Sequence, residues 1–99
     1  MLIIRDIMHC KPGQVRTMVG KFQQLSKEIK KMGFGPLRIM TDISGERYWT
    51  VVAEQEVESL DKYAEAVGKQ MADKKLQKIM NDYHELVESG HRQIFKLEK

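Results

Sequence analysis

The sequence predicts an α+β protein with the ferredoxin-like βαββαβ order and an antiparallel sheet. Three features predict it: an isoleucine-rich opening run before a Pro-Gly pair, two segments with helical hydrophobic periodicity, and a pair of β-rich runs between them. The resulting order is strand, helix, strand, strand, helix, strand. Because crossovers are right-handed, this order places the first strand between the third and the fourth, antiparallel to both.

The first third of the chain predicts one strand and one helix. Residues 2–10 (LIIRDIMHC) are β-rich and end at Pro12-Gly13, which is typical of a turn. From Gln14, apolar residues recur at steps of three and four, which predicts an amphipathic helix that ends at Gly33. The apolar positions are Val15, Met18, Phe22, Leu25, Ile29 and Met32.

The middle of the chain predicts a hairpin, and the remainder predicts a long helix and a last strand. Two β-rich runs, 36–43 and 47–56, flank Ser44-Gly45, a turn signal. Ser59 is expected to cap a second helix. Its apolar stripe changes phase after Met71, which predicts a kink or break near residues 72–74. The helix is then expected to continue to Gly90, and HRQIFKLE to form the final strand.

Composition bounds the class of protein. The chain of 99 residues is expected to form one domain, residues 1–99, because so short a chain cannot build a second core. It is 41% hydrophobic and 31% charged, which excludes disordered and membrane classes. The net charge of +3 comes from lysines mixed with acids, so no nucleic-acid surface is expected. The opening run is too short for a signal peptide, and a lone cysteine forms no internal disulfide, so we expect a cytoplasmic protein.

The strands indicate a partner. Side chains alternate between the two faces of a strand, yet neither face of residues 2–10 is cleanly polar, and the third strand behaves in the same way. We therefore expect helices to cover one face of the sheet and a second copy of the chain to cover the other. The expected assembly is a homodimer.

Four segments carry a family resemblance: CKPGQVRTMVGKFQQL, KKMGFG, ERYWTVVAEQEVESLDKYAEA and SGHRQIFKL. In this order they resemble the Lys-Pro-Gly turn and first helix, the helix-ending Gly-Phe, the third strand with the capped second helix, and the final strand of one superfamily. That superfamily is the dimeric α/β-barrel superfamily, in particular its antibiotic-biosynthesis monooxygenase-like and NIPSNAP-like branches. The resemblance implies two sheets facing one another in a dimeric barrel, with a small-molecule cleft between sheet and helices. It implies no single reaction, since the superfamily includes cofactor-free oxygenases, haem-degrading enzymes, isomerases and ligand-binding regulators.

The histidines are the candidate catalytic residues. His9 and Cys10 are adjacent in a strand and point to opposite faces, so they cannot form a Cys-His dyad, and Cys10 is expected to be a small apolar residue. His9 is expected near His91, since antiparallel pairing joins the two strand ends. His84 lies at the border of the helical stripe, where it would line a cleft. The three histidines could converge or each sit at an element end. Because their spacing matches no ligand motif, we expect no metal and no cofactor.

The remaining candidates are aromatic or charged. Tyr48, Trp49, Tyr83 and His91 are candidate ligand-binding residues, and the aromatic ones could equally be core or interface residues. Asp6, on a central strand, is either a carboxylate with a raised pKa or a partner in a salt bridge. The arginines that could form that salt bridge are Arg38, Arg47 and Arg92.

Two functions follow from these observations. The first is the binding or turnover of a small, largely apolar organic molecule, with a cofactor-free oxygenase or isomerase as the enzymatic form and His84 or His9 as its base. The alternative is a non-catalytic ligand-binding or interaction module with a closed cleft. An open cleft that holds a polar group would favour the first, and a filled cleft the second.

Overall fold

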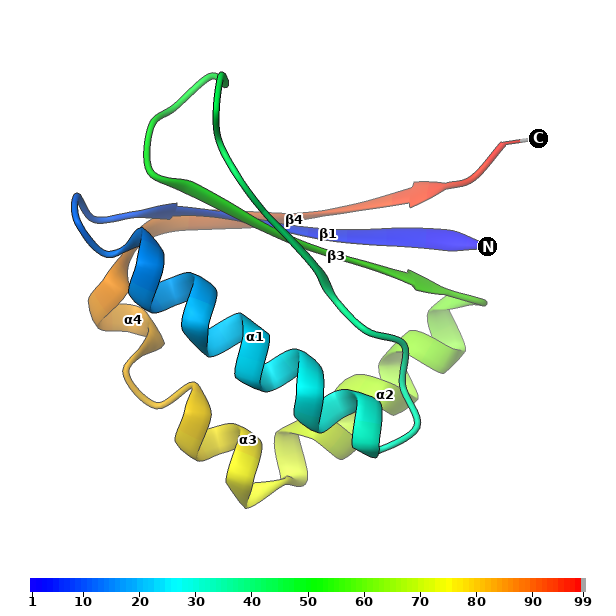
Figure 1. Cartoon of the computed structure of the whole chain (residues 1–99). Coiled ribbons are helices and arrows are strands. Elements are labelled where there is room, and N and C mark those ends of the chain that lie inside the picture. The colour runs from blue at the N-terminus through cyan, green and yellow to red at the C-terminus, as the bar shows by residue number, and fades with distance from the viewer. Residues whose placement is uncertain (99) are drawn as a thin grey trace.

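Four antiparallel strands form one sheet in the order β2-β3-β1-β4 (Figure 1). The computed structural model describes residues 1–98. The strands are β1 (Leu2–Cys10), β2 (Arg38–Thr41), β3 (Thr50–Val57) and β4 (Val87–Lys96). β1 pairs with β3 on one side and with β4 on the other. The predicted fold class and the predicted central place of the first strand are therefore confirmed.

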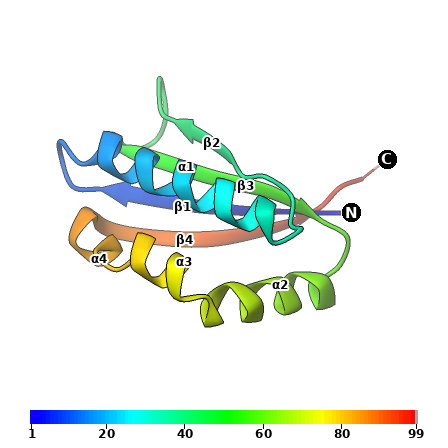
Figure 2. The same cartoon turned by 60° about the horizontal axis from the view of Figure 1, so that its bottom comes forward.

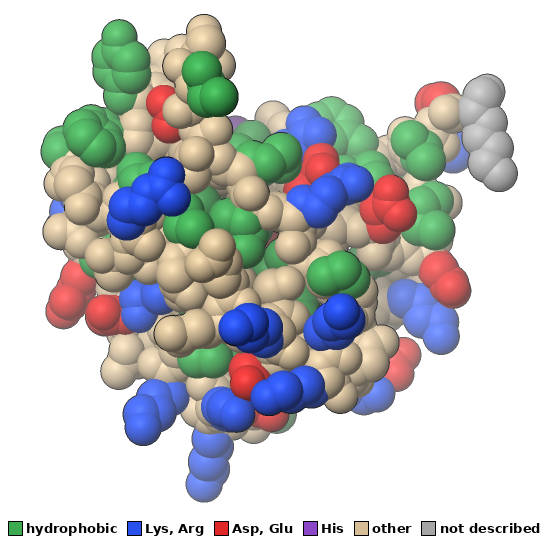
Figure 3. All heavy atoms as spheres, in the orientation of Figure 1, with side chains coloured by type: hydrophobic (Ala, Val, Ile, Leu, Met, Phe, Trp, Pro, Cys, Tyr) green, Lys and Arg blue, Asp and Glu red, His purple; other side chains and the backbone are tan. Residues whose placement is uncertain are grey.

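All helices lie on one face of this sheet (Figures 1 and 2). They are α1 (Val15–Lys31), α2 (Leu60–Ala72), α3 (Lys74–Ile79) and α4 (Tyr83–Leu86). None of the helices within residues 1–98 has the length and hydropathy that a membrane crossing requires. Lysine and arginine side chains are spread over the outside of the helical layer, with acidic side chains among them (Figure 3).

The core lies between β1, β3 and the apolar stripe of α1. Alternation turns Met8 and Cys10 of β1 toward the helices, where Met18 and Phe22 of α1 meet them. Met18 and Val51 are fully buried. The face of β1 that carries residues 4, 6, 8 and 10 is thus the helix-facing one, and residues 3, 5, 7 and 9 lie on the open face.

Two side chains delimit α2. The Ser59 hydroxyl accepts a hydrogen bond from the Lys62 backbone N–H, which confirms the predicted cap. Asp73 ends α2 in an extended conformation and caps α3, since its Oδ1 accepts from the N–H groups of Lys75 and Leu76 at 2.9 and 3.1 Å. The predicted break near residues 72–74 is confirmed, and a capping aspartate produces it.

The predicted continuation of this helix to Gly90 is wrong. The chain breaks again after α3, where Lys21 of α1 donates to the Ile79 carbonyl at 2.8 Å and pairs with Asp82. Gly90 lies inside β4 opposite Met8, and a Cβ there would be 3.1 Å from the Ile7 carbonyl oxygen. Gly90 therefore permits a close approach of two strands and does not end a helix.

The predicted hairpin strands, 36–43 and 47–56, are too long toward the turn. The ladder between β2 and β3 ends at Thr41 and Val51. Beyond it, the Thr50 backbone N–H donates to the Asp42 side chain at 2.8 Å and not to a backbone carbonyl, while the Asp42 N–H still donates to the Thr50 carbonyl at 3.3 Å. Trp49 has a φ of 61°, in the left-handed region that interrupts a strand. Tyr48 and Trp49 consequently belong to the loop rather than to β3.

An ion-pair network crosses the open face of the sheet. Arg5 donates from Nε and Nη2 to Glu54 Oε1 at 3.1 and 2.6 Å, and Arg38 Nη2 lies 2.7 Å from Oε2. Glu54 is only 7% exposed, because the two arginines cover it. Their hydrogen bonds hold the pKa of Glu54 below its ordinary value, Arg5 having the largest effect and burial opposing it.

Glu54→Gln is expected to lower the free energy of unfolding by about 2 kcal/mol at pH 7, since hydrogen bonds to a charged group are lost. Because the pKa is depressed in the folded state, this contribution is present above the ordinary carboxyl pKa, about 4.3, and disappears as the pH falls through the folded value. Urea unfolding of both proteins from pH 7 to pH 3 measures the difference. Glu56→Gln, an exposed position on the same face of β3, is the control. A difference that does not shrink in acid would contradict this account.

Candidate functional site

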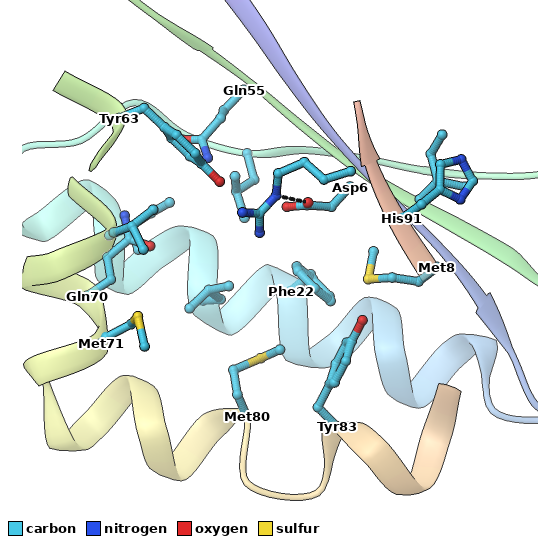
Figure 4. Close-up of a pocket in the computed structure, with 16 residues that line it drawn as sticks. Asp6, Met8, Phe22, Gln55, Tyr63, Gln70, Met71, Met80, Tyr83 and His91 are labelled. Atoms are coloured by element: carbon cyan, nitrogen blue, oxygen red, sulfur yellow. Dashed lines mark hydrogen bonds and ion pairs between the residues drawn. The ribbon is translucent and has the colours of Figure 1, made fainter. Parts of the chain in front are cut away.

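A cleft of about 450 Å³ lies between the helix-facing side of the sheet and the helical layer (Figure 4). The sheet contributes residues of β1, β3 and β4, α1 forms one wall, and α2 and the segment from Met80 to Tyr83 form the other. Only Ala66 of α2 is buried, so this helix stands off from the sheet. Apolar side chains dominate the lining: Met8, Phe22, Leu25, Ile29, Leu37, Val67, Met71 and Met80.

An ion pair lies in this apolar lining. Asp6 and Arg92 are register partners on β1 and β4, and Arg92 Nε donates to Asp6 Oδ1 at 2.5 Å. Of the three arginines that the sequence offered as partners for Asp6, the structure selects Arg92. Burial alone would lower the pKa of Arg92, but the hydrogen bond and the attraction of Asp6 raise it. The pair thus places a carboxylate and a guanidinium side by side in the cleft.

Two tyrosines flank the ion pair. The Tyr63 ring lies 5.5 Å from Arg92 Cζ, in a cation–π contact. Tyr83 packs edge-on against Phe22 with ring centroids 6.5 Å apart. Burial raises the pKa of both phenols and the Asp6 charge raises it further, while the Arg92 charge opposes these effects. Both hydroxyl groups are therefore protonated at neutral pH and available as hydrogen-bond donors.

Of the predicted site residues, Tyr83 lines the cleft and His84 does not. His84 is exposed on α4, and its ring meets Tyr83 edge-on at 5.5 Å. Within residues 1–98, the lining of the cleft includes Tyr83 but not its neighbour. The sequence predicts His84 at the border of the apolar stripe of the second helix. The break between α3 and α4 changes the direction of the turn that carries His84, so its side chain lies outside the cleft.

His9 and His91 come together as predicted, at the open face. Their ring centroids are 5.9 Å apart, and His9 Nδ1 lies 3.2 Å from Thr50 Oγ1. Burial lowers the pKa of His9, and Arg47 and His91 lower it further while Glu46 opposes them. The part of β4 that carries His91 borders the cleft. In Figure 4 its ring lies away from Tyr63 and Gln70.

The histidines do not form a three-ligand site. In the part of the chain that the structure describes, no three His, Cys, Asp or Glu side chains are grouped closely enough to hold a metal ion. Cys10 is buried, and burial raises the pKa of its thiol, as expected for an apolar core position.

Tyr48 and Trp49 lie at a different place. They line a shallow pocket of about 510 Å³ between the hairpin loop and the first turn of α1, with Arg16 and Asp42. Tyr48 is 84% and Trp49 45% exposed. They are therefore separate from the cleft that contains Tyr83.

Sequence reasoning missed three polar residues of the cleft. These are Tyr63, which was interpreted as part of an apolar stripe, Gln55 and Gln70. It left Asp6 with three possible arginine partners and did not place the resulting ion pair in the cleft. One signal could have found the pair. Antiparallel pairing of residues 2–10 with the last strand puts an acid opposite an arginine on the helix-facing side, once the register is known.

The comparisons with known proteins identify the fold. No family model matches the chain, and no curated protein has a significantly similar sequence. A solved structure of a NIPSNAP family protein with unknown function from Agrobacterium tumefaciens is similar, with a TM-score of 0.83 and 22% identity over 98% of this chain and 87% of that chain. An uncharacterized NIPSNAP domain protein from Burkholderia xenovorans has a TM-score of 0.84 and 18% identity, over 99% and 95%. An antibiotic biosynthesis monooxygenase has a TM-score of 0.74 and 11% identity, over 100% of both chains.

The resemblance inferred from the sequence is thereby confirmed at the level of structure. At these identities the likeness establishes a shared fold and leaves the reaction open. This chain has the ferredoxin-like α+β fold that solved NIPSNAP and antibiotic biosynthesis monooxygenase structures share.

Proposed function

We propose that the protein binds a small, largely apolar organic molecule in the cleft between sheet and helices. The observation that carries the proposal is the Asp6–Arg92 ion pair exposed in the wall of an open, largely apolar cleft. Small-molecule sites combine an apolar lining with a few polar groups that orient the ligand. An open cleft with a polar group is the outcome that favours a small-molecule site over a closed interaction module.

The cleft also contains groups suited to cofactor-free chemistry. An isomerase or a cofactor-free oxygenase needs a base to take a proton from the substrate and a donor to stabilise the oxygen that becomes negative. In this proposal the Asp6 carboxylate is the base, and the protonated hydroxyl of Tyr63 or Tyr83 is the donor. Asp6 takes the role that the sequence predicted for His84 and His9, because neither histidine faces the cleft.

We further propose that the protein is cytoplasmic and forms a homodimer. Each subunit would contribute one domain to a dimeric α/β barrel. The open face of the sheet supports the dimer. Across the strands its residues form three rows: Met40–Val52–Ile7–His91, Arg38–Glu54–Arg5–Gln93 and Glu56–Ile3–Phe95. Met40, Phe95 and the nearby Leu97 are 42%, 45% and 50% exposed. Exposed apolar side chains on the open face of a sheet, here on both sides of the Arg5–Glu54–Arg38 ion-pair network, are typical of an interface.

Val67→Trp is expected to weaken fragment binding in the cleft, because Val67 lines it from α2 and an indole would occupy part of it. Titration of the labelled protein with small aromatic fragments, followed by NMR, should shift resonances of Phe22, Met80 and Tyr83 in the unchanged protein. In the variant, the affinity should fall at least tenfold, about 1.4 kcal/mol.

Leu60→Trp provides the matched control, since Leu60 is on the same helix but 58% exposed and outside the described lining. It should bind fragments as the unchanged protein does. Shifts confined to other surfaces, or binding that the Val67 variant retains, would show that the cleft is not the site.

A further inference from the structure

We propose that the ligand's polar end is a neutral group that donates and accepts hydrogen bonds side by side, such as a primary amide or a lactam. This inference rests on the proposed function and specifies the chemistry of that same cleft. Three observations support the inference: the ion pair has hydrogen-bonding groups without a partner among the described residues, its two charges cancel, and the side-chain amides of Gln55 and Gln70 lie in the same cleft.

The ion pair is only partly engaged. Among the described residues, one hydrogen bond joins Arg92 Nε to Asp6 Oδ1. A ligand could therefore bind to Asp6 Oδ2 and to the two terminal nitrogens of Arg92. The Asp6 side chain is 28% exposed and the Arg92 side chain 51%. The pair therefore presents an acceptor beside donors, and an amide presents a donor beside an acceptor. The two sets are complementary.

Charge disfavours an anionic ligand. Asp6 and Arg92 are the carboxylate and the guanidinium of the described lining, and their charges cancel. A ligand carboxylate bound to Arg92 would lie next to the Asp6 carboxylate, so that repulsion would offset much of the attraction. An amide bonds to both side chains with no such repulsion.

Three other polar side chains, all uncharged, lie on one side of the ion pair. Figure 4 shows Gln55, Tyr63 and Gln70 at one end, with Asp6 between them and Met8. Carboxamides and a protonated phenol hydrogen-bond an amide without desolvating a further charge. On the helical side of the ion pair, the apolar side chains of Phe22 and Met80 would contact the body of the ligand. The cleft thus combines uncharged polar side chains next to the ion pair with an apolar wall.

Three probes with the same ring test this inference: benzamide, benzoate and toluene. In NMR titrations at pH 7, benzamide is expected to bind about tenfold more tightly than either of the others, the effect of roughly one net hydrogen bond. Asp6→Asn removes the negative charge and leaves Arg92 uncompensated. In that variant the order should reverse, with benzoate gaining at least tenfold relative to benzamide. Asp42→Asn, at the hairpin loop, is the control and should keep the original order.

The outcomes separate the two proposals. If benzoate or toluene binds the unchanged protein as tightly as benzamide does, the amide inference is overturned, while the proposal of a small-molecule site stands. The amide inference is also overturned if Asp6→Asn leaves the order of the three affinities unchanged. If none of the probes shifts the resonances of the cleft, and the wider set of fragments also fails, both proposals are overturned.

Discussion

Phe22→Ala is expected to lower the free energy of unfolding by about 3 kcal/mol, the usual loss for a buried aromatic side chain. Phe22 is 6% exposed, belongs to the central core cluster and supports Tyr83 edge-on. Removing its ring enlarges the cleft and leaves space that β1 and α1 cannot fill without shifting toward each other. Urea unfolding monitored by circular dichroism measures the loss.

Phe34→Ala is the matched control for this change. Phe34 is only half-buried and follows the end of α1, so a loss of about 1 kcal/mol is expected there. The two substitutions remove the same number of atoms, which isolates the effect of packing. Equal losses at both positions would mean that the cluster around Phe22 is not the principal core.

Val52→Lys is expected to convert a dimer into a monomer, raising the dissociation constant more than a hundredfold. Val52 lies at the centre of the open face between Met40 and Ile7, so a second copy would bury the new charge without a partner. The lysine stem can lie along the sheet in a monomer, so the fold should survive. Light scattering at micromolar concentration should report twice the chain mass of 11.6 kDa for the unchanged protein and the chain mass for the variant.

Leu60→Lys places the same charge on the helical side of the molecule, where Leu60 is already 58% exposed. It should remain dimeric. A Val52 variant that keeps twice the chain mass would place the interface elsewhere, and an unchanged protein that is monomeric at these concentrations would remove the barrel from the proposal.

The candidate site could be predicted only in part. Tyr83 was recognised because its helical spacing turns it toward the sheet, and the arginine set that included Arg92 was recognised from the position of Asp6. The prediction that His84 lines the cleft assumes that the helix continues without a further interruption from the break near residues 72–74 to Gly90. The contacts of Lys21 with Ile79 and Asp82 interrupt that helix. Lys21 is distant in sequence, so no local pattern near His84 could indicate them.

The sequence by itself determined the order of elements, the bounds of β1, the extent of α1 to within two residues at either end and the break at Asp73. Each of these depends on residues a few positions apart, which periodicity and capping report directly. Only the tertiary structure decided the end of the hairpin ladder at Thr41, the strand position of Gly90 and the meeting of Asp6 with Arg92 in the cleft. The last of these joins residues 86 positions apart, and their contact depends on strand register and packing, which no local run of residues specifies.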